Sequence, residues 1–348
     1  MQNTKGEWRS LVKRFLTRRS FINYGLSEKI VDVLGYPNFY GPNKTVVLDI
    51  YSGTAVFSAA LQNHIQPHRH VLMEPFPVYS KLLSSLERRP EIYYDEEDPF
   101  RWSAFQNLVK NRVYEPQIKS RDHVHNAMLF TANLLHAQGE QLVTQYLNCV
   151  TNQNWIQRFG RVRLLLWMRA ATAEKLLAGP GEMARHRLSC QRESCCDARV
   201  VLHKNPKHSS TDRVGRAPYP KVLQSPLISA DEIDLARDFT KAVPDVSLIE
   251  LTPHEHQVEH VDEFEYVVKN LCMLKGTPLA QSLNALGPGA VDDLSPQLSD
   301  LLNVKPDHLH FADFQRITDV FVRWPFKPEH LHDFYESKSL MGGSTFEE

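Results

Sequence analysis

The chain has 348 residues, of which 42% are hydrophobic and 23% are charged, so it is long enough for one large globular domain and a smaller one. Its longest strongly apolar run, residues 162–168, contains an arginine and is far too short to cross a bilayer. We therefore expect no membrane-spanning segment.

The formal net charge of −1 conceals an uneven distribution. Residues 1–150 carry 17 basic and 14 acidic side chains, residues 151–221 carry 14 and 5, and residues 222–348 carry 9 and 22. The three net charges are thus +3, +9 and −13. A basic middle segment beside an acidic end predicts one face for a polyanion and another for a protein, with an ordinary solvated surface as the alternative.

The five cysteines are an odd number in no repeating frame, which argues against a disulfide scaffold and favours a reducing compartment. Three of them cluster at positions 190, 195 and 196, with His186 and His203 nearby. The cluster lacks the paired C-x-x-C spacing of zinc sites, so we predict free thiols and no metal, with metal binding as the alternative.

The first 21 residues contain six basic side chains and one acidic one, without the apolar core of a secretory signal. This pattern is compatible with mitochondrial import, and equally with a basic surface helix.

From Lys44 the chain reads KTVVLDIYSG, a β-branched apolar run that ends at an acid and a Ser-Gly turn. A helical pattern (56–65) and a second apolar run (70–75) follow, which together open a βαβ unit and predict a parallel sheet covered by helices. Further strands are predicted over 128–133, 162–168 and 246–253, with helices over 140–150 and 171–178.

Residues 180–226 are rich in Gly, Pro, Ser, His and Arg and predict irregular loops around one or two short strands. After Pro253 the chain turns acidic, with helical patterns over 261–274, 277–287, 295–304 and 311–324. We therefore predict an α/β domain over 1–253, a helical domain over 254–335 and a flexible C-terminal tail over 336–348.

Polar residues follow four of the predicted strands, at the position where an open parallel sheet binds a nucleotide-type ligand. A small residue after the first strand lets the backbone approach the ligand, an acid after the second accepts hydrogen bonds from ribose hydroxyls, and an acid after the third meets an adenine amino group. Together they predict a methyltransferase-like cofactor site made of Asp49, Tyr51, Gly53, Glu74, Asp98 and Asn133.

This order resembles the rRNA adenine dimethyltransferase superfamily, which has E-I-G-P-G-x-G in motif I, acids after strands two and three, and N-L-P-Y after strand four. Within it the chain resembles most the fungal mitochondrial transcription factor B branch, from about residue 20 to 335. The stretches that carry the likeness are DIYSG (49–53), DPFRW (98–102), NQNWIQRFGRVRLLLWM (152–168), KLLAGPG (175–181), LKGTPL (274–279) and WPFKP (324–328). The resemblance implies a Rossmann-like class I methyltransferase domain with a small C-terminal helical domain.

The chain departs from the catalytic pattern in three motifs. Tyr51 and Ser52 replace glycine and proline, and Ala55 replaces another glycine. After Asn133 and Leu134, the pair Leu135-His136 replaces Pro-Tyr, and RRSFI (18–22) stands where catalytic members carry G-Q-N-F-L. Since the chemistry needs those groups to position the flipped adenine, we predict a protein that is not an enzyme and requires no cofactor. Whether S-adenosylmethionine still binds stays open.

The branch implies a non-enzymatic factor of the mitochondrial matrix and nucleoid that helps a single-subunit RNA polymerase to melt promoter DNA and select the start site. The old methyltransferase cleft would trap the melted non-template strand, with aromatic side chains stacking on bases and basic ones holding phosphates. The candidate nucleic-acid contacts are Phe100, Trp102, Gln153, Arg158, Arg161 and Lys175.

Each of these contacts has a structural alternative. Trp102 is equally a partly buried anchor between helix and sheet, Arg161 and Arg163 alternate along a strand and cannot both be assumed to face DNA, and Glu174 weakens the patch around Lys175. The acidic helical domain would dock on a basic polymerase surface, and the tail from Glu336 would enter the polymerase active-site cleft. We expect a monomer.

Two other functions remain open. The first is an active, S-adenosylmethionine-dependent mitochondrial rRNA adenine dimethyltransferase. The replaced residues in motif I and in the fourth motif argue against this function. The second is a general RNA-binding or ribosome-assembly protein, which explains the basic segment and leaves the likeness to the transcription-factor branch unexplained.

Overall fold

The computed structural model describes residues 19–206 and 220–331. The predictions made for the basic N-terminal segment up to residue 18 and for the tail from Glu336 lie outside these residues. Within the described part of the chain, no helix is long and apolar enough to span a membrane.

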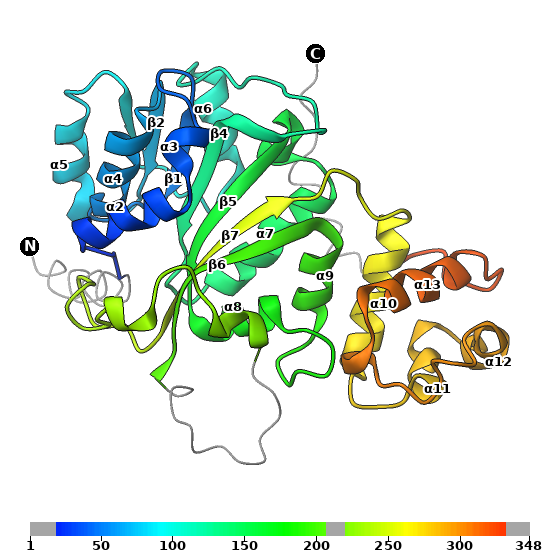
Figure 1. Ribbon diagram of the computed structural model, residues 1–348. Helices are drawn as coiled ribbons and strands as arrows, with labels where there is room; N and C mark the ends of the chain where they lie inside the picture. The colour runs from blue at the N-terminus through cyan, green and yellow to red at the C-terminus, as the bar shows by residue number, and fades with distance from the viewer. Residues whose placement is uncertain (1–18, 207–219, 332–348) are drawn as a thin grey trace, which may run out of the picture.

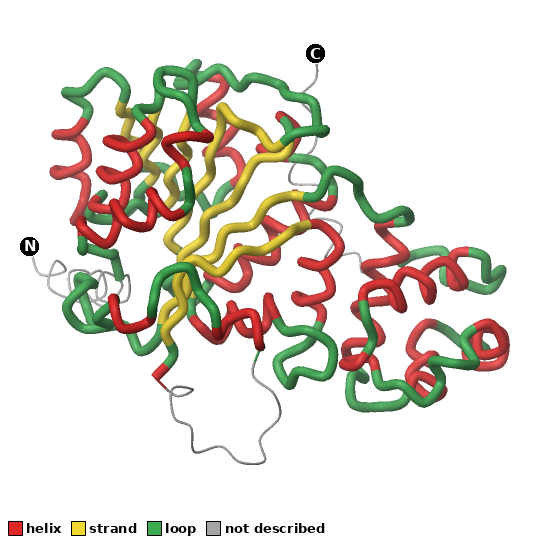
Figure 2. The backbone as a smooth tube through the Cα atoms, viewed as in Figure 1, coloured by secondary structure: helices red, strands yellow, loops and turns green. Residues whose placement is uncertain are grey.

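A seven-stranded sheet with strand order β3-β2-β1-β4-β5-β7-β6 forms the centre of the molecule (Figures 1 and 2). Its neighbouring strands pair in parallel, except that β7 runs antiparallel to both β5 and β6. This is the predicted Rossmann-like class I methyltransferase arrangement. The strands are β1 (Val46–Ile50), β2 (Arg69–Met73), β3 (Ile92–Asp95), β4 (Val124–Asn133), β5 (Arg161–Met168), β6 (Cys196–Lys204) and β7 (Val246–Pro253).

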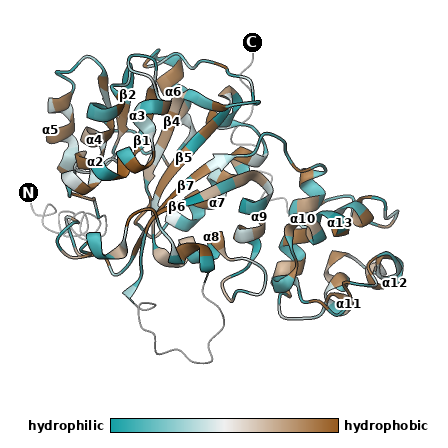
Figure 3. Ribbon diagram, viewed as in Figure 1, coloured by the Kyte–Doolittle hydropathy of each residue, from teal (hydrophilic) through white to brown (hydrophobic). Residues whose placement is uncertain are grey.

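Helices cover both faces of this sheet. Successive side chains of a strand point to opposite faces, so a strand covered on both sides carries apolar residues at consecutive positions. Val46, Leu48 and Ile50 of β1 belong to one apolar core, while Val47 belongs to a second one. The hydropathy of the residues follows this division, with apolar residues concentrated on the central strands (Figure 3). The helices of the α/β unit are α2 (Tyr24–Val33), α3 (Tyr36–Phe39), α4 (Val56–Ile65), α5 (Pro77–Leu86), α6 (Trp102–Lys110), α7 (Gly139–Thr151), α8 (Ala170–Leu177) and α9 (Arg187–Cys195).

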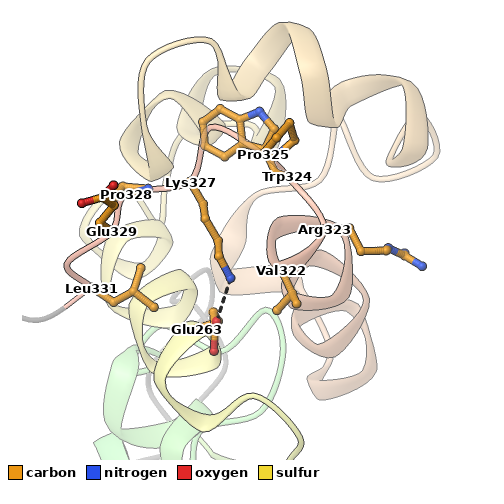
Figure 4. A pocket seen from close by; sticks show the side chains of 9 residues that line it. All are labelled: Glu263, Val322, Arg323, Trp324, Pro325, Lys327, Pro328, Glu329 and Leu331. Carbon is orange, nitrogen blue, oxygen red and sulfur yellow. Dashed lines mark hydrogen bonds and ion pairs between the residues drawn. The ribbon is translucent and has the colours of Figure 1, made fainter.

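A small helical unit with its own apolar core follows β7 (Figure 1). Its helices are α10 (Val261–Met273), α11 (Leu279–Ser282), α12 (Ala290–Leu294) and α13 (Phe311–Val322). The segment after α13 folds back over α10: Trp324 donates from its indole nitrogen to Asp293 at 2.8 Å, and Lys327 forms an ion pair with Glu263 at 2.9 Å (Figure 4). A surface hollow of about 560 Å³ lies beside this ion pair.

The helical unit and the α/β unit meet at α9. Cys190 of α9 lies in the core of the helical unit, and Arg185, just before α9, is almost fully buried. The Arg185 guanidinium makes two hydrogen bonds to Glu193, at 2.8 and 2.9 Å, and donates to the carbonyl of Leu309 at 2.8 Å. Because Leu309 belongs to the helical unit, one buried cation ties the two units together.

Two predictions about secondary structure were wrong. Residues 180–226 were expected to be irregular around short strands, but they contain α9 and the nine-residue strand β6. Helix α9 lacks an apolar stripe because it buries polar groups instead; Ser189, for example, donates to the carbonyl of Lys175. Residues 295–304 were expected to be helical and form only a short 3₁₀ turn, because their carbonyls at 302 and 304 accept hydrogen bonds from the start of α11.

Arg185→Ala is expected to lower the free energy of unfolding by about 3–5 kcal/mol, because it removes the buried guanidinium that makes two hydrogen bonds to the mostly buried Glu193 and leaves only the longer ion pair with Arg192 at 3.6 Å. Urea unfolding of the full chain measures this change. The matched control is Arg316→Ala, since Arg316 also pairs with a carboxylate through two nitrogens but does so at the surface, with Asp300. Equal losses in the two variants would contradict the role given to Arg185.

Candidate functional site

The carboxyl ends of β1, β2 and β4 meet at one edge of the sheet. Ile50 lies opposite Met73 in β2 and opposite Ala132 in β4, so the residues that follow these strands emerge side by side. The structure therefore brings Tyr51, Glu74 and Asn133 together, in the place where parallel sheets bind ligands.

The turn after β1 is fixed by Glu74. Gly53, in the left-handed region with φ 57°, donates its N–H to one carboxylate oxygen of Glu74 at 3.0 Å, and Phe76 donates its N–H to the other at 3.1 Å. Glu74 is fully buried. The carboxylate predicted to hold ribose hydroxyls thus accepts hydrogen bonds from the protein's own backbone.

Tyr51 occupies the middle of the site. It is also in the left-handed region, with φ 59°, and only 2% of it is exposed. Its hydroxyl donates to Asp98 at 3.0 Å, and its ring meets the ring of His136 edge-on at a centroid distance of 5.1 Å. Asp98 also accepts the N–H of Phe100 at 3.0 Å. The tyrosine therefore links the motif I turn to Asp98, which was predicted to meet an adenine amino group, and to His136, which stands where the family has the tyrosine of N-L-P-Y.

Residues 19–21 lie across the same edge. The side-chain amide of Asn133 donates to the carbonyl of Arg19 at 2.9 Å, and a Cβ on Gly53 would lie 1.8 Å from the Ser20 hydroxyl oxygen. The ring of Phe21 stacks on Trp167 at 4.8 Å. The segment at the position of the family's G-Q-N-F-L thus packs directly on the motif I glycine.

Asp49 lies deeper than the other predicted cofactor residues. It is buried and accepts a hydrogen bond from Ser58 of α4, and the ring of the buried His70 lies 3.5 Å away. Asp49 therefore connects β1 to α4. It contributes to the site only by lining a small cavity.

That cavity does not fit the cofactor. It measures about 20 Å³, room for about one water molecule, whereas pockets for small-molecule ligands hold about 300–1,000 Å³. Tyr51, Phe21 and Trp167 are among the residues that line it. Glu74 and Asp98, which were predicted to meet the ribose and the adenine, do not line this cavity.

The predicted aromatic contacts lie beside this edge. Phe100 is half-buried in the loop after Asp98. Trp102 begins α6, and its ring packs edge-on against Trp155 at 5.3 Å within an aromatic cluster that also contains Phe105. Trp102 is thus anchored between helix and sheet, as its structural alternative proposed, and Phe100 is likewise partly buried against the same apolar core.

Three other predicted contacts lie at the opposite edge of the sheet. Arg161 begins β5 opposite Val124, whereas Asn133 lies opposite Trp167 at the far end of the same strand pair. The Arg161 guanidinium donates to the carbonyl of Pro253 at 2.9 Å. Gln153 and Arg158 precede β5 in the same region, and the exposed Arg158 lies over the ring of Phe159. The predicted nucleic-acid contacts therefore do not form one groove, because they lie at opposite ends of β5.

Lys175, on α8, forms an ion pair with Glu140 at 2.7 Å, and both side chains are about two-fifths exposed, at 40% and 42%. Its neighbour Glu174 accepts a hydrogen bond from Asn205. The positive charge predicted for phosphate is thus partly neutralised within the protein.

Sequence reasoning missed the partners of these residues. It placed Tyr51 and Asp98 in one site without the hydrogen bond between them, and it gave no role to Arg19 or Ser20. The only sequence feature that pointed to this segment was the replacement of the family's G-Q-N-F-L, and it did not indicate which residues the segment contacts.

No group of three His, Cys, Asp or Glu side chains in ranges 19–206 and 220–331 is placed to hold a metal ion. His186 caps α9, and His203 is hydrogen-bonded to Ser247. All five cysteines fall within these ranges, and none of them is paired in a disulfide there.

Comparisons with known proteins agree with the motif assignment. The family model of ribosomal RNA adenine dimethylases matches residues 8–319. The chain is 32% identical over 330 residues to a Mitochondrial transcription factor 1 from Lachancea kluyveri, which covers 93% of this chain and 94% of that protein. It is also 32% identical over 332 residues to Mitochondrial transcription factor 1 from Saccharomyces cerevisiae, with 94% of both chains covered.

Solved structures with the same fold include a dimethyladenosine transferase from Plasmodium falciparum. It has a TM-score of 0.55 and 16% identity, and the match covers 86% of this chain and 95% of that one. The 23S rRNA methyltransferase ErmE has a TM-score of 0.53 and 12% identity, with 86% and 98% covered. At these identities the likeness shows the fold alone.

Gly53→Ala is expected to lower the free energy of unfolding by about 1–3 kcal/mol, because the new methyl group meets Ser20 and the left-handed backbone disfavours alanine. Thermal and urea unfolding measure the loss. The control is Gly276→Ala, where a Cβ would meet nothing within 4 Å. If the two variants are equally stable, the segment 19–21 does not pack on the motif I turn.

Proposed function

This chain belongs to the ribosomal RNA adenine dimethylase family, and we propose that it acts as a mitochondrial transcription initiation factor. It assists a single-subunit RNA polymerase in melting the promoter and selecting the start site, in the mitochondrial matrix and nucleoid. It does so by holding melted non-template bases at the edge where a methyltransferase would hold its substrate adenine. The name of its relatives, mitochondrial transcription factor, supports this direction.

One observation supports the proposal most directly. The residues at the positions of a methyltransferase's cofactor site form hydrogen bonds to other groups of the protein here. Gly53 donates to Glu74, Tyr51 donates to Asp98, and the amide of Asn133 donates to Arg19. These hydrogen bonds hold the site together within the protein itself. We therefore propose a function that uses the fold without the cofactor and without methyl transfer.

The loop after β3 provides the first contact with DNA. Phe100 is half-buried beside the closed site, and Arg101 next to it is exposed. Stacking of a base on an aromatic side chain contributes about 1–3 kcal/mol, and separating a stacked base pair costs about 1.4 kcal/mol per step. One or two trapped bases thus offset the cost of opening a short stretch of promoter.

Basic residues before the start of β5 and after its end provide further contacts, separate from each other and from Phe100. Arg158 is exposed at the edge opposite Phe100, and Lys175 shares its charge with Glu140. These side chains suit the phosphate backbone, whose contacts position a strand without reading its sequence. Promoter recognition therefore depends largely on the polymerase.

The helical unit is the proposed docking surface for the polymerase. Residues 254–331 contain 12 acidic and six basic side chains, so this unit complements a basic partner surface. In this proposal one copy of the protein binds one polymerase.

The alternative is an active rRNA adenine dimethyltransferase, which the family model favours by its description. Full-length protein incubated with radiolabelled S-adenosylmethionine and small-subunit rRNA distinguishes the two. We expect no methyl transfer above the level without protein; catalytic incorporation into adenine would replace the proposed function with the alternative.

Phe100→Ala is expected to reduce the melted fraction of a duplex promoter at least about fivefold in the presence of polymerase, because a stacking surface worth about 1–3 kcal/mol is lost. Fluorescence of 2-aminopurine in the non-template strand near the start site reports the unpaired bases. The control is Ile118→Ala, since Ile118 is an exposed apolar residue at the opposite edge. Equal signals for both variants and the wild type would rule out trapping at Phe100.

A further inference from the structure

A cluster of positive side chains lies at the amino ends of β4 and β5, at the edge of the sheet opposite the closed site. Val124, the first residue of β4, lies opposite Arg161, the first residue of β5, so the segments before these two strands meet there. Residues 110–123 and 158–161 together carry six basic and two acidic side chains, a net charge of +4. The basic residues, which form what we call the basic edge, are Lys110, Arg112, Lys119, Arg121, Arg158 and Arg161.

Hydrogen bonds between the two segments hold these cations on one surface. The backbone N–H of Lys119 donates to the carbonyl of Phe159 at 2.8 Å. The Arg121 guanidinium donates to the carbonyl of Gln157 at 3.1 Å, and the Arg161 guanidinium donates to the carbonyl of Arg121 at 3.3 Å. The loop before β4 is therefore fixed against the turn before β5, and the basic side chains of both stand beside one another.

The charge of this surface is not cancelled from within the protein. Backbone carbonyls orient the guanidinium groups of Arg121 and Arg161 without neutralising them. In ranges 19–206 and 220–331, neither group forms an ion pair with a carboxylate, whereas Lys175 pairs with Glu140. Burial and, after it, the positive charge of Arg161 lower the pKa of Arg121. Because neighbouring cations repel each other, an anion bound between them stabilises this arrangement.

Lys119 and Arg158 extend the basic edge into solvent. Both side chains are exposed, and the Arg158 guanidinium lies over the ring of Phe159, 5.2 Å from its centroid. Lysine binds a phosphate oxygen as a point charge, and arginine binds two oxygens with its fork of N–H donors. The basic edge thus offers both kinds of phosphate contact on one rigid surface.

The carboxyl edge has the opposite charge on the side of β3. Residues 95–98 are all acidic and lie just before Phe100. A base held at Phe100 is therefore bound by stacking, and its strand gains little from phosphate contacts there. The two edges are at least about 26 Å apart, since β5 has eight residues and a strand rises about 3.3 Å per residue. This distance corresponds to about eight base pairs of duplex DNA.

We propose that Lys119, Arg121, Arg158 and Arg161 bind the phosphate backbone of double-stranded DNA next to the melted bases. This inference rests on the proposed role in transcription, because DNA held at Phe100 continues as a duplex long enough to reach the basic edge. The surface reads no sequence, since every base pair carries the same phosphates. It holds the duplex in place while other contacts select the promoter.

The test measures binding of the full-length protein, without polymerase, to a fluorescein-labelled DNA duplex of about 30 base pairs by fluorescence anisotropy, at about 50 to 200 mM salt. The double variant Lys119→Ala/Arg158→Ala removes two exposed cations and leaves the guanidinium groups that join the loops. The matched control is Lys305→Ala/Arg323→Ala, which removes the same charge from exposed positions of the helical unit. Urea unfolding checks that both variants are folded.

We expect the wild type and the control to bind the duplex alike and to lose affinity steeply as salt increases. The Lys119→Ala/Arg158→Ala variant should bind about tenfold more weakly at the lowest salt. The slope of its logarithmic binding constant against logarithmic salt concentration should be smaller by about 2, because two phosphate contacts are lost.

Three results would overturn the proposal: equal affinities and slopes for the two double variants, no binding of the wild type at the lowest salt, or a loss of affinity for an RNA duplex with none for DNA. The assay also separates this surface from the trapping of melted bases. Weakened duplex binding in Lys119→Ala/Arg158→Ala, together with unchanged promoter melting in Phe100→Ala, would retain the surface and remove the trapping. The reverse pair of results would remove the surface alone.

Discussion

The buried carboxylate of Glu74 is the interaction on which the rest of the site depends. A fully buried charge is costly unless hydrogen bonds satisfy it, and here the N–H groups of Gly53 and Phe76 do so. These bonds fix the turn after β1, which places Tyr51 in a left-handed conformation and directs its hydroxyl to Asp98. The backbone of the chain thus supplies the hydrogen bonds that satisfy this buried carboxylate.

Closure of the site follows from that turn. With Gly53 held against Glu74, Ser20 packs on the glycine, and Asn133 is bonded to Arg19. Beside Asn133, the cavity lined by Phe21, Tyr51 and Trp167 measures only about 20 Å³. A fold can keep its architecture while the site it carries changes its use. This chain keeps the sheet, its helices and the edge where parallel sheets bind ligands. The proposed contact with DNA lies on the loop after β3, beside the cleft, and not inside the cleft.

Much of the fold and the location of the site could be predicted from the sequence, because they depend on local patterns. The apolar run before Asp49 and the residue types that follow β2 and β4 place Tyr51, Glu74 and Asn133 at one edge of a parallel sheet. The departures in motif I also drew attention to Tyr51, which lines the small cavity at this edge.

The partners of these residues could not be predicted, because they come from far away in the chain. Asn133 bonds to Arg19, and the segment at Ser20 is held by Thr240, contacts that no local pattern encodes. Helix α9 was missed because it buries polar side chains, which removes the apolar periodicity. Arg161 was grouped with Lys175 by charge, although the length of β5 separates the two ends of the sheet.

The most direct test of the central claim is initiation by the cognate mitochondrial polymerase on two templates, with and without this protein. One template is the duplex promoter, and the other is the same promoter already unpaired around the start site. The account predicts that the protein is required on the duplex and nearly dispensable on the unpaired template, without added S-adenosylmethionine. Equal dependence on both templates, or none on either, would contradict a role in promoter melting.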